Sequence, residues 1–315
     1  MRCICSLLLL LAFSCGAENI PPPRYAFYHW QTDLTLPPNR LADYDVQRLY
    51  IKAFDISWTD GQPQPSALLV TGQDSLPREA VPVVFITNEV FAHPAPSLIP
   101  DLLTLLEEVF PYPYTELQID CDWTAGTRDA YFSFLQALRD ATGLTISCTV
   151  RLHQYRDRKL QGIPPVDRAV LMAYNTGDLE RWETDNSIVD PTIIAQYVEN
   201  QPPYPLPLDL AVAAYDWAVV YRQGRLAYLI NEPDLRELAD TFRFTPLSRG
   251  RYQVDSSTYY GGLYLYRSDM IRHEVADTAL ARRLGRDLWP RIANPGSRYL
   301  IYYRIGSRQW NNSGN

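Results

Sequence analysis

Short runs of aromatic, β-branched and other apolar residues recur along the chain, and several of them are separated by stretches with helical periodicity. The strand-like runs are at residues 24–31, 48–58, 81–91, 116–123, 144–151, 168–176, 208–221 and 261–269. The helix-like stretches are at 98–110, 129–141, 192–199 and 233–242. Strands that alternate with helices predict a parallel sheet with helices packed outside it.

Eight such units predict an α/β fold of the (β/α)8 TIM-barrel type, which typically takes ~250 residues. The chain has 315 residues, 46% of them hydrophobic, and so contains enough apolar side chains for such a core. Two links are irregular: the second and third strands are joined without a convincing helix, and a long insertion, 222–260, precedes the eighth strand. Within it, the alternating run 251–260 suggests a hairpin over the barrel mouth. A further run, 299–305, is a ninth strand candidate for the bottom or an edge of the barrel.

The N-terminus carries a targeting signal. Arg2 precedes an apolar run that includes five consecutive leucines. This run is too short to cross a bilayer as a helix, because a transmembrane helix needs ~20 apolar residues. We therefore expect a signal peptide over residues 1–14. The segment 11–15 resembles a bacterial lipobox, which implies that Cys15 becomes the first mature residue and anchors the protein to a membrane through acyl chains. The alternative is an ordinary signal peptide with an incidental cysteine.

This interpretation divides the chain into a signal peptide, a lipidated Cys15 with a stiff proline-rich spacer to residue 23, and a single barrel domain over 24–315. It also predicts an exported lipoprotein of the cell envelope. Gly16 follows the cysteine in place of a retention aspartate, which favours the outer membrane of a Gram-negative bacterium.

Charge and cysteine content exclude several classes of partner. The 36 acidic and 29 basic residues give a net charge of −7, and the basic residues form no run, so nucleic acid is not an expected partner. Cys121 and Cys148 lie in apolar strand-like runs and should behave as small buried hydrophobes; a disulfide between neighbouring strands is the alternative. No zinc spacing, nucleotide-binding loop or serine-nucleophile elbow is present, so we expect no metal and no cofactor.

The chemistry of such barrels lies at the C-terminal ends of the strands. Asp120 and Asp122 point the same way at the end of the fourth predicted strand, because side chains alternate along a strand. Two inward carboxylates ~7 Å apart raise each other's pKa unless a cation compensates them, and Lys52 is the candidate cation. A salt-bridge network beneath a loop is the alternative interpretation of this pair.

Three segments together resemble the family 18 chitinase-like glycosidases. They are 119–123 (Ile-Asp-Cys-Asp-Trp), 172–175 (Met-Ala-Tyr-Asn) and 261–263 (Gly-Gly-Leu), and their order and spacing agree with that family over residues 24–269. The resemblance implies a retaining mechanism in which the acetamido group of the substrate attacks, oriented by residues at the positions of Asp122 and Tyr174. The position of the proton-donating glutamate is occupied by Thr124.

Threonine cannot donate a proton at a useful pKa, and loss of general acid catalysis costs ~10²- to 10⁴-fold in rate. The segments 28–31 and 49–55 also resemble an uncharacterised family of bacterial lipoproteins with a related barrel, which implies a fold and an envelope location but no activity.

Three hypotheses follow. In the first, the protein is a glycosidase whose acid has moved, with Glu89 or Asp216 paired against Asp120 or Asp122. In the second, it binds a glycan without cutting it. The residues expected to bind the sugar are Tyr174, Asn175, Trp30, Trp58, Trp123, Trp217, Arg151 and Arg267. In the third, the barrel is a structural scaffold in the envelope, because a fold alone does not fix function.

Overall fold

The computed structural model describes residues 20–36, 38–72 and 75–311. The predicted signal peptide and Cys15 lie outside these residues. No helix in the described ranges has the length and apolar character needed to cross a bilayer.

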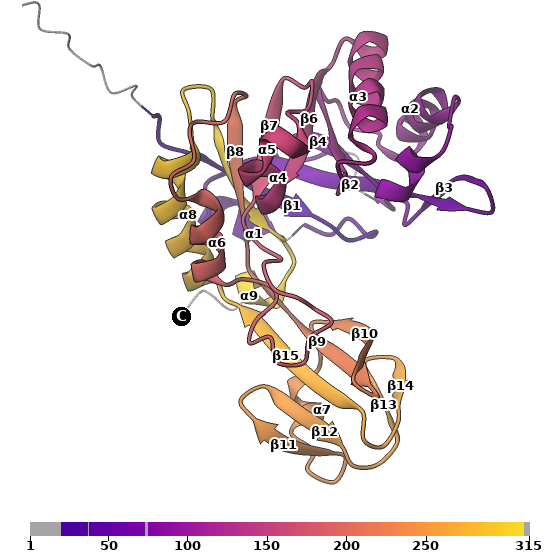
Figure 1. The fold of residues 1–315 in the computed structure, drawn as a ribbon, viewed down its shortest axis with the longest axis vertical. Coiled ribbons are helices and arrows are strands. Elements are labelled where there is room, and N and C mark those ends of the chain that lie inside the picture. The colour runs from indigo at the N-terminus through magenta and orange to yellow at the C-terminus, as the bar shows by residue number, and fades with distance from the viewer. Residues whose placement is uncertain (1–19, 37, 73–74, 312–315) are drawn as a thin grey trace, which may run out of the picture.

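Eight parallel strands form a closed barrel, which confirms the predicted TIM-barrel fold (Figure 1). They follow one another around the barrel in chain order, and the ring closes because the first strand pairs in parallel with both the second and the last. The barrel strands are β1 (Arg24–His29), β2 (Val46–Thr59), β4 (Glu79–Ile86), β5 (Glu116–Asp120), β6 (Thr145–Arg151), β7 (Arg168–Met172), β8 (Leu208–Ala213) and β16 (Tyr299–Tyr303).

Helices surround the barrel. Three of the four predicted helices are observed: α2 (Leu98–Val109), α3 (Arg128–Thr142) and α6 (Pro191–Val198). In α6 the Asp190 side chain accepts hydrogen bonds from the first free backbone N–H groups, which explains where the helix begins. The fourth prediction, 233–242, contains only the single turn α7 (Leu235–Leu238). The other helices are α1 (Pro38–Asp43), the 3₁₀ helix η1 (Asn88–Ala92), α4 (Leu152–Arg156), α5 (Arg158–Gln161), α8 (Thr278–Ile292) and α9 (Arg308–Asn311).

The link between the second and third barrel strands is irregular, as predicted. Instead of leading into a helix, β2 runs on beyond the barrel and turns back as the antiparallel strand β3 (Gln62–Ser66). The turn lies at Asp60 and Gly61, whose φ angles of 53° and 78° are in the left-handed region that favours asparagine, aspartate and glycine.

The position of the eighth strand differs from the prediction. The barrel is closed by β16, so the assignment of 261–269 to the eighth strand was wrong, as was the placement of 299–305 at the bottom or an edge. The physical reason for this difference is that a strand in a closed parallel barrel must be buried on both of its faces. The first four residues of β16 are all buried, as a parallel barrel strand requires, whereas Tyr264 and Tyr266 of the predicted strand are exposed.

An insertion before the eighth strand is confirmed, and it begins earlier than expected. The predicted strand 208–221 is divided after β8, and the chain leaves the barrel as β9 (Tyr215–Arg222). An antiparallel sheet of order β10-β9-β15-β12-β11 follows, with its own cluster of buried apolar side chains, and extends away from the barrel strands (Figure 1). Its remaining strands are β10 (Arg225–Asn231), β11 (Phe244–Ser248), β12 (Arg251–Val254) and β15 (Met270–Ala276), beside the hairpin of β13 (Thr258–Tyr260) and β14 (Leu263–Leu265). The predicted hairpin 251–260 is thus divided between two sheets.

Buried ion pairs fill the barrel near the N-terminal ends of its strands. Arg48 contacts Glu116 at 2.6 Å, and Arg168 contacts Asp209 at 2.8 Å, with all four side chains almost fully buried. Cys121 and Cys148 are free and buried, which agrees with their prediction as small core residues.

Candidate functional site

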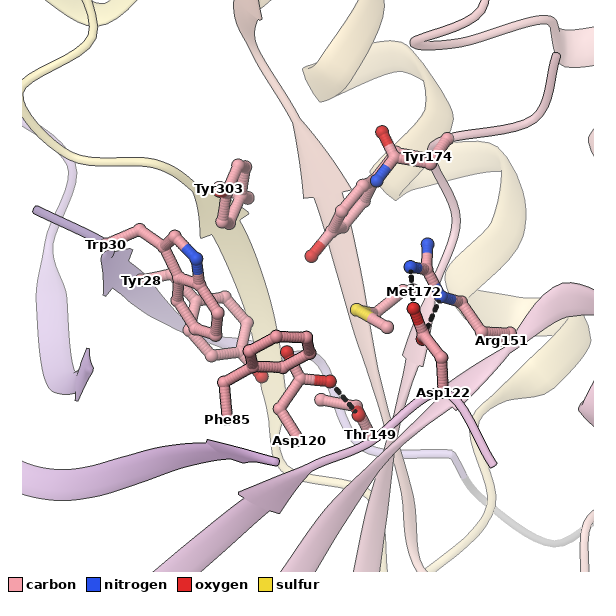
Figure 2. A pocket seen from close by; sticks show the side chains of 11 residues that line it. Tyr28, Trp30, Phe85, Asp120, Asp122, Thr149, Arg151, Met172, Tyr174 and Tyr303 are labelled. Atoms are coloured by element: carbon pink, nitrogen blue, oxygen red, sulfur yellow. Dashed lines mark hydrogen bonds and ion pairs between the residues drawn. The ribbon is translucent and has the colours of Figure 1, made fainter. Parts of the chain in front are cut away.

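A cavity of about 160 Å³ opens among the C-terminal ends of the barrel strands (Figure 2). Six strands contribute to it, either directly or through the residues that follow them: β1, β4, β5, β6, β7 and β16. Its lining consists of Tyr28, Trp30, Phe85, Asp120, Asp122, Thr149, Arg151, Met172, Tyr174, Asn175 and Tyr303.

Asp120 lies at the base of this cavity, at the end of β5, and is 6% exposed. The Thr149 hydroxyl donates a hydrogen bond of 2.5 Å to its Oδ1. Burial, and then repulsion from the Asp122 carboxylate, raises the pKa of Asp120 to about 6. Asp120 therefore changes its charge near neutral pH, where most aspartates are fully ionised.

Asp122 is held by Arg151 in a bidentate ion pair. The Nη2 of Arg151 donates to Oδ2 of Asp122 at 2.5 Å, and its Nε donates to Oδ1 (Figure 2). The register of β5 and β6 explains both contacts: Ile119 lies opposite Cys148, so continuing that register sets Asp120 beside Thr149 and Asp122 beside Arg151.

Lys52, the cation predicted to compensate Asp120 and Asp122, instead forms an ion pair with Asp55. Its Nζ lies 2.9 Å from Asp55, three residues along the same strand. Residues three apart normally face opposite sides of a strand, but the pairing of β2 with β4 shifts register between Lys52 and Phe54, which brings both side chains to one side. The assignment of Lys52 to the Asp120 and Asp122 pair was therefore wrong.

Aromatic rings form much of the remaining wall. Tyr174 stacks on Tyr303 with ring centroids 5.2 Å apart. The ring centroid of Trp30 lies 5.8 Å from those of Tyr28 and Tyr303. The hydroxyl of Tyr174 is directed into the cavity (Figure 2). The site thus combines apolar ring surfaces with a few convergent polar groups, as ligand sites typically do.

Six of the predicted site residues line this cavity: Asp120, Asp122, Tyr174, Asn175, Trp30 and Arg151. The two residues proposed as a relocated acid do not. Glu89 lies in the 3₁₀ helix η1. Asp216 is fully buried on β9, where it pairs with Arg308 and lies 2.9 Å from His273. It is removed from the site because the chain has already turned out of the barrel at Tyr215.

Four other predicted binding residues also lie outside the cavity lining. Trp58 stacks on His93 with centroids 4.3 Å apart. Trp123 is fully buried and donates a hydrogen bond of 3.0 Å from Nε1 to the Gln161 carbonyl. Trp217 is 8% exposed and donates to Glu274. Arg267 is exposed in the insertion, just after β14.

Sequence reasoning missed five lining residues: Tyr28, Phe85, Thr149, Met172 and Tyr303. For two of them a signal existed, because Tyr28 alternates with Trp30 and Thr149 alternates with Arg151, so each pair shares one face of its strand. Tyr303 could not be found in this way, because its strand had been assigned to the bottom or an edge of the barrel.

Thr124, at the position where a glutamate would be the acid, is exposed and is not part of the cavity lining. Its backbone N–H donates to Thr127 Oγ1 at 3.1 Å, at the start of α3. Among the described residues, Asp120 and Asp122 are the only carboxylates that line the cavity.

Comparison with known proteins supports the fold. The sequence matches no family model and no curated protein. A chitinase from Chromobacterium violaceum ATCC 12472 shares the fold with a TM-score of 0.52 and 13% identity, over 92% of this chain and 97% of the chitinase. The spore cortex-lytic enzyme SleL of Bacillus cereus gives a TM-score of 0.49 and 16% identity, over 93% of this chain and 74% of SleL. The similarity to the chitinase thus supports the TIM-barrel fold seen in the strand topology.

Proposed function

We propose that this protein binds a glycan at the mouth of its barrel and does not hydrolyse it. The fold is shared with a chitinase, a protein that acts on a glycan. The cavity supplies aromatic faces for sugar rings and polar groups for their hydroxyls. Its volume of about 160 Å³ is below the ~300–1,000 Å³ of drug-sized ligand sites, so we expect it to hold one sugar unit of a longer chain.

One observation argues against hydrolysis: Thr124 stands at the position of the proton-donating glutamate, and among the described residues only Asp120 and Asp122 bring a carboxyl group to the cavity lining. Glycosidases of most families need a carboxylic acid beside the leaving oxygen and a second carboxyl group across the bond. Here both oxygens of Asp122 accept hydrogen bonds from Arg151, and Thr124 replaces the expected acid. Asp120 lies at the base of the cavity, at the first Asp of the Asp-x-Asp pair and not at the position of the acid.

A binding assay combined with product detection tests this proposal. We expect the purified protein to be retained by immobilised β-1,4-linked glucosamine and N-acetylglucosamine oligomers without releasing shorter products. Tyr174→Phe and Trp30→Ala should each weaken binding by about 5- to 30-fold, because one hydrogen bond or one stacked ring contributes ~1–2 kcal/mol. Trp58→Ala, outside the cavity lining, is the matched control.

Release of new reducing ends that depends on Asp120 or Asp122 would overturn the proposal in favour of a glycosidase with an unusual acid. If neither binding nor product release is detected on a wider panel of glycans, the scaffold hypothesis takes its place.

Binding should also depend on pH through Asp120. Because its pKa is raised to about 6, Asp120 gains its charge as pH rises through that value. Charge-assisted hydrogen bonds are roughly twice as strong as neutral ones, so affinity should rise with pH and level off above ~7. Between pH 7 and pH 5 we expect a loss of about tenfold, measured by titration calorimetry. Asp120→Asn should give a flat profile, and a profile that keeps its midpoint near 6 in this variant would assign the titration to another group.

We also propose that the protein is a lipoprotein of the cell envelope, anchored through Cys15 to the outer membrane of a Gram-negative bacterium. The support is the lipobox-like segment 11–15. Expressed in a Gram-negative host fed an alkyne-bearing fatty acid, the full chain should take up the label and sediment with the outer membrane. Cys15→Ser should lose both properties. Label that persists in this variant would contradict the assignment.

A further inference from the structure

Three carboxylates lie at or near the cavity, and two of them have a cation. Asp55 contacts Lys52 at 2.9 Å, and Asp122 is held by Arg151. Within the described part of the chain, Asp120 has no ion-pair partner. The Arg151 charge, which also acts on Asp120, is shared with Asp122, so these residues include one more carboxylate than cation.

The surroundings of Asp120 make this charge significant. Its side chain is more than nine-tenths buried, and its hydrogen bond comes from a neutral hydroxyl, that of Thr149. Its Oδ2 makes no hydrogen bond with the described residues, although the residue lines the cavity. A buried carboxylate without a cation is costly and usually loses its charge. Burial, and then repulsion from Asp122, raises the pKa of Asp120, so a cationic group beside it would favour its ionised form.

The cavity walls favour a cation as well. The faces of aromatic rings are electronegative and attract ammonium groups within ~6 Å. Five rings line this cavity: Tyr28, Trp30, Phe85, Tyr174 and Tyr303. Lys52 Nζ lies 5.8 Å from the Trp30 ring centroid, but its charge is paired with Asp55 at 2.9 Å. Aromatic rings and a carboxylate that lacks its own ion pair are the two kinds of group that bind ammonium ligands in proteins.

We infer that the cavity selects an amino sugar with a free ammonium group, which pairs with Asp120 among these five aromatic rings. This inference rests on the proposed glycan-binding function and names its ligand class. An N-acetylated sugar carries no charge and would leave Asp120 buried without a cation, whereas the deacetylated sugar supplies one.

Titration calorimetry with two chemically matched oligomers tests the inference. At pH 6, the full chain should bind a fully deacetylated glucosamine pentamer at least about tenfold more tightly than the fully acetylated pentamer. Pairing with an ammonium favours the ionised form of Asp120. Binding should therefore release protons from Asp120 at this pH, which is measured by repeating the titration in buffers of different ionisation enthalpy.

Asp120→Asn should bind the deacetylated and acetylated pentamers with about equal affinity, and binding should no longer release a proton. The asparagine Oδ1 can still accept from Thr149, so this variant should fold, which its thermal unfolding would verify. Asp287→Asn, an exposed carboxylate on α8, is the control for net charge and should behave as the unmodified protein does.

The outcomes separate this inference from the proposed function. Equal or tighter binding of the acetylated pentamer would overturn the inference and leave glycan binding standing. A preference that persists in Asp120→Asn would also overturn it, because another group would then recognise the charge. If neither pentamer binds but tetramethylammonium chloride binds in a way that Asp120→Asn abolishes, the ammonium site is real and the glycan function is wrong.

Discussion

Replacement of Asp209 by alanine is expected to lower the free energy of unfolding by about 3–5 kcal/mol, because it removes one partner of a buried ion pair. Asp209 is fully buried, and its Oδ2 accepts a hydrogen bond of 2.8 Å from Arg168, which is also buried. Its Oδ1 accepts from the backbone N–H groups of Arg298 and Tyr299 at 2.6 and 2.9 Å. Alanine would leave a guanidinium and two backbone donors without partners inside the barrel.

Urea denaturation measures this loss directly. Asp129→Ala, which breaks an exposed pair with Arg128, is the control and should cost less than ~1 kcal/mol. The double variant Arg168→Met, Asp209→Leu should recover part of the loss, because no charge is then left unpaired, although the backbone N–H groups of Arg298 and Tyr299 still lack their acceptor. A loss below ~1 kcal/mol for Asp209→Ala would mean that water or another group replaces the carboxylate.

Acid should destabilise the fold through His29. This residue is fully buried at the end of β1, and burial, together with the positive charge of Arg304, lowers its pKa from 6.5 to about 4. Between these two values the unfolded chain binds a proton that the folded chain does not, so stability falls as pH decreases from 6.5 to 4. The shift corresponds to about 3 kcal/mol lost over this range.

His29→Phe removes this titration while keeping a ring of similar size. When the pH is lowered from 7 to 4, the free energy of unfolding should fall by about 3 kcal/mol less in the variant than in the unmodified protein. Urea denaturation at each pH measures this difference. Asp120 works in the opposite direction, since its contribution to stability is present below pH 3.8 and is lost as pH rises through about 6. Comparing the two proteins at the same pH cancels the Asp120 effect. Parallel pH profiles would show that His29 does not carry the acid sensitivity.

Under the proposed function, two features of the site separate binding from hydrolysis. The Asp-x-Asp strand end and Tyr174 remain at the mouth, but Arg151 occupies both oxygens of Asp122. Asp120 is left as the carboxylate available to a ligand. The residue types that suggest catalysis from sequence are thus the ones on which the proposed recognition of an ammonium group depends.

The sequence by itself predicted the barrel, because local patterns determine which segments become strands and helices. The apolar face of α3 and the Asp190 cap of α6 depend on residues close together in the chain. The alternation of side chains along β5 and its continuation likewise sufficed to set Asp120 and Asp122 on one side. The irregular link after β2 and an insertion before the last strand were visible as stretches without helical or strand periodicity.

Only the tertiary structure decided which strand closes the barrel and which charges meet. The segments 261–269 and 299–305 look alike locally, and the choice between them depends on burial of both faces against strands far away in sequence. The pairing of Asp122 with Arg151 depends on the register between β5 and β6, and that of Lys52 with Asp55 on an irregularity in the pairing of β2 with β4. Registers are fixed by the packing of the whole barrel, and no local pattern records them.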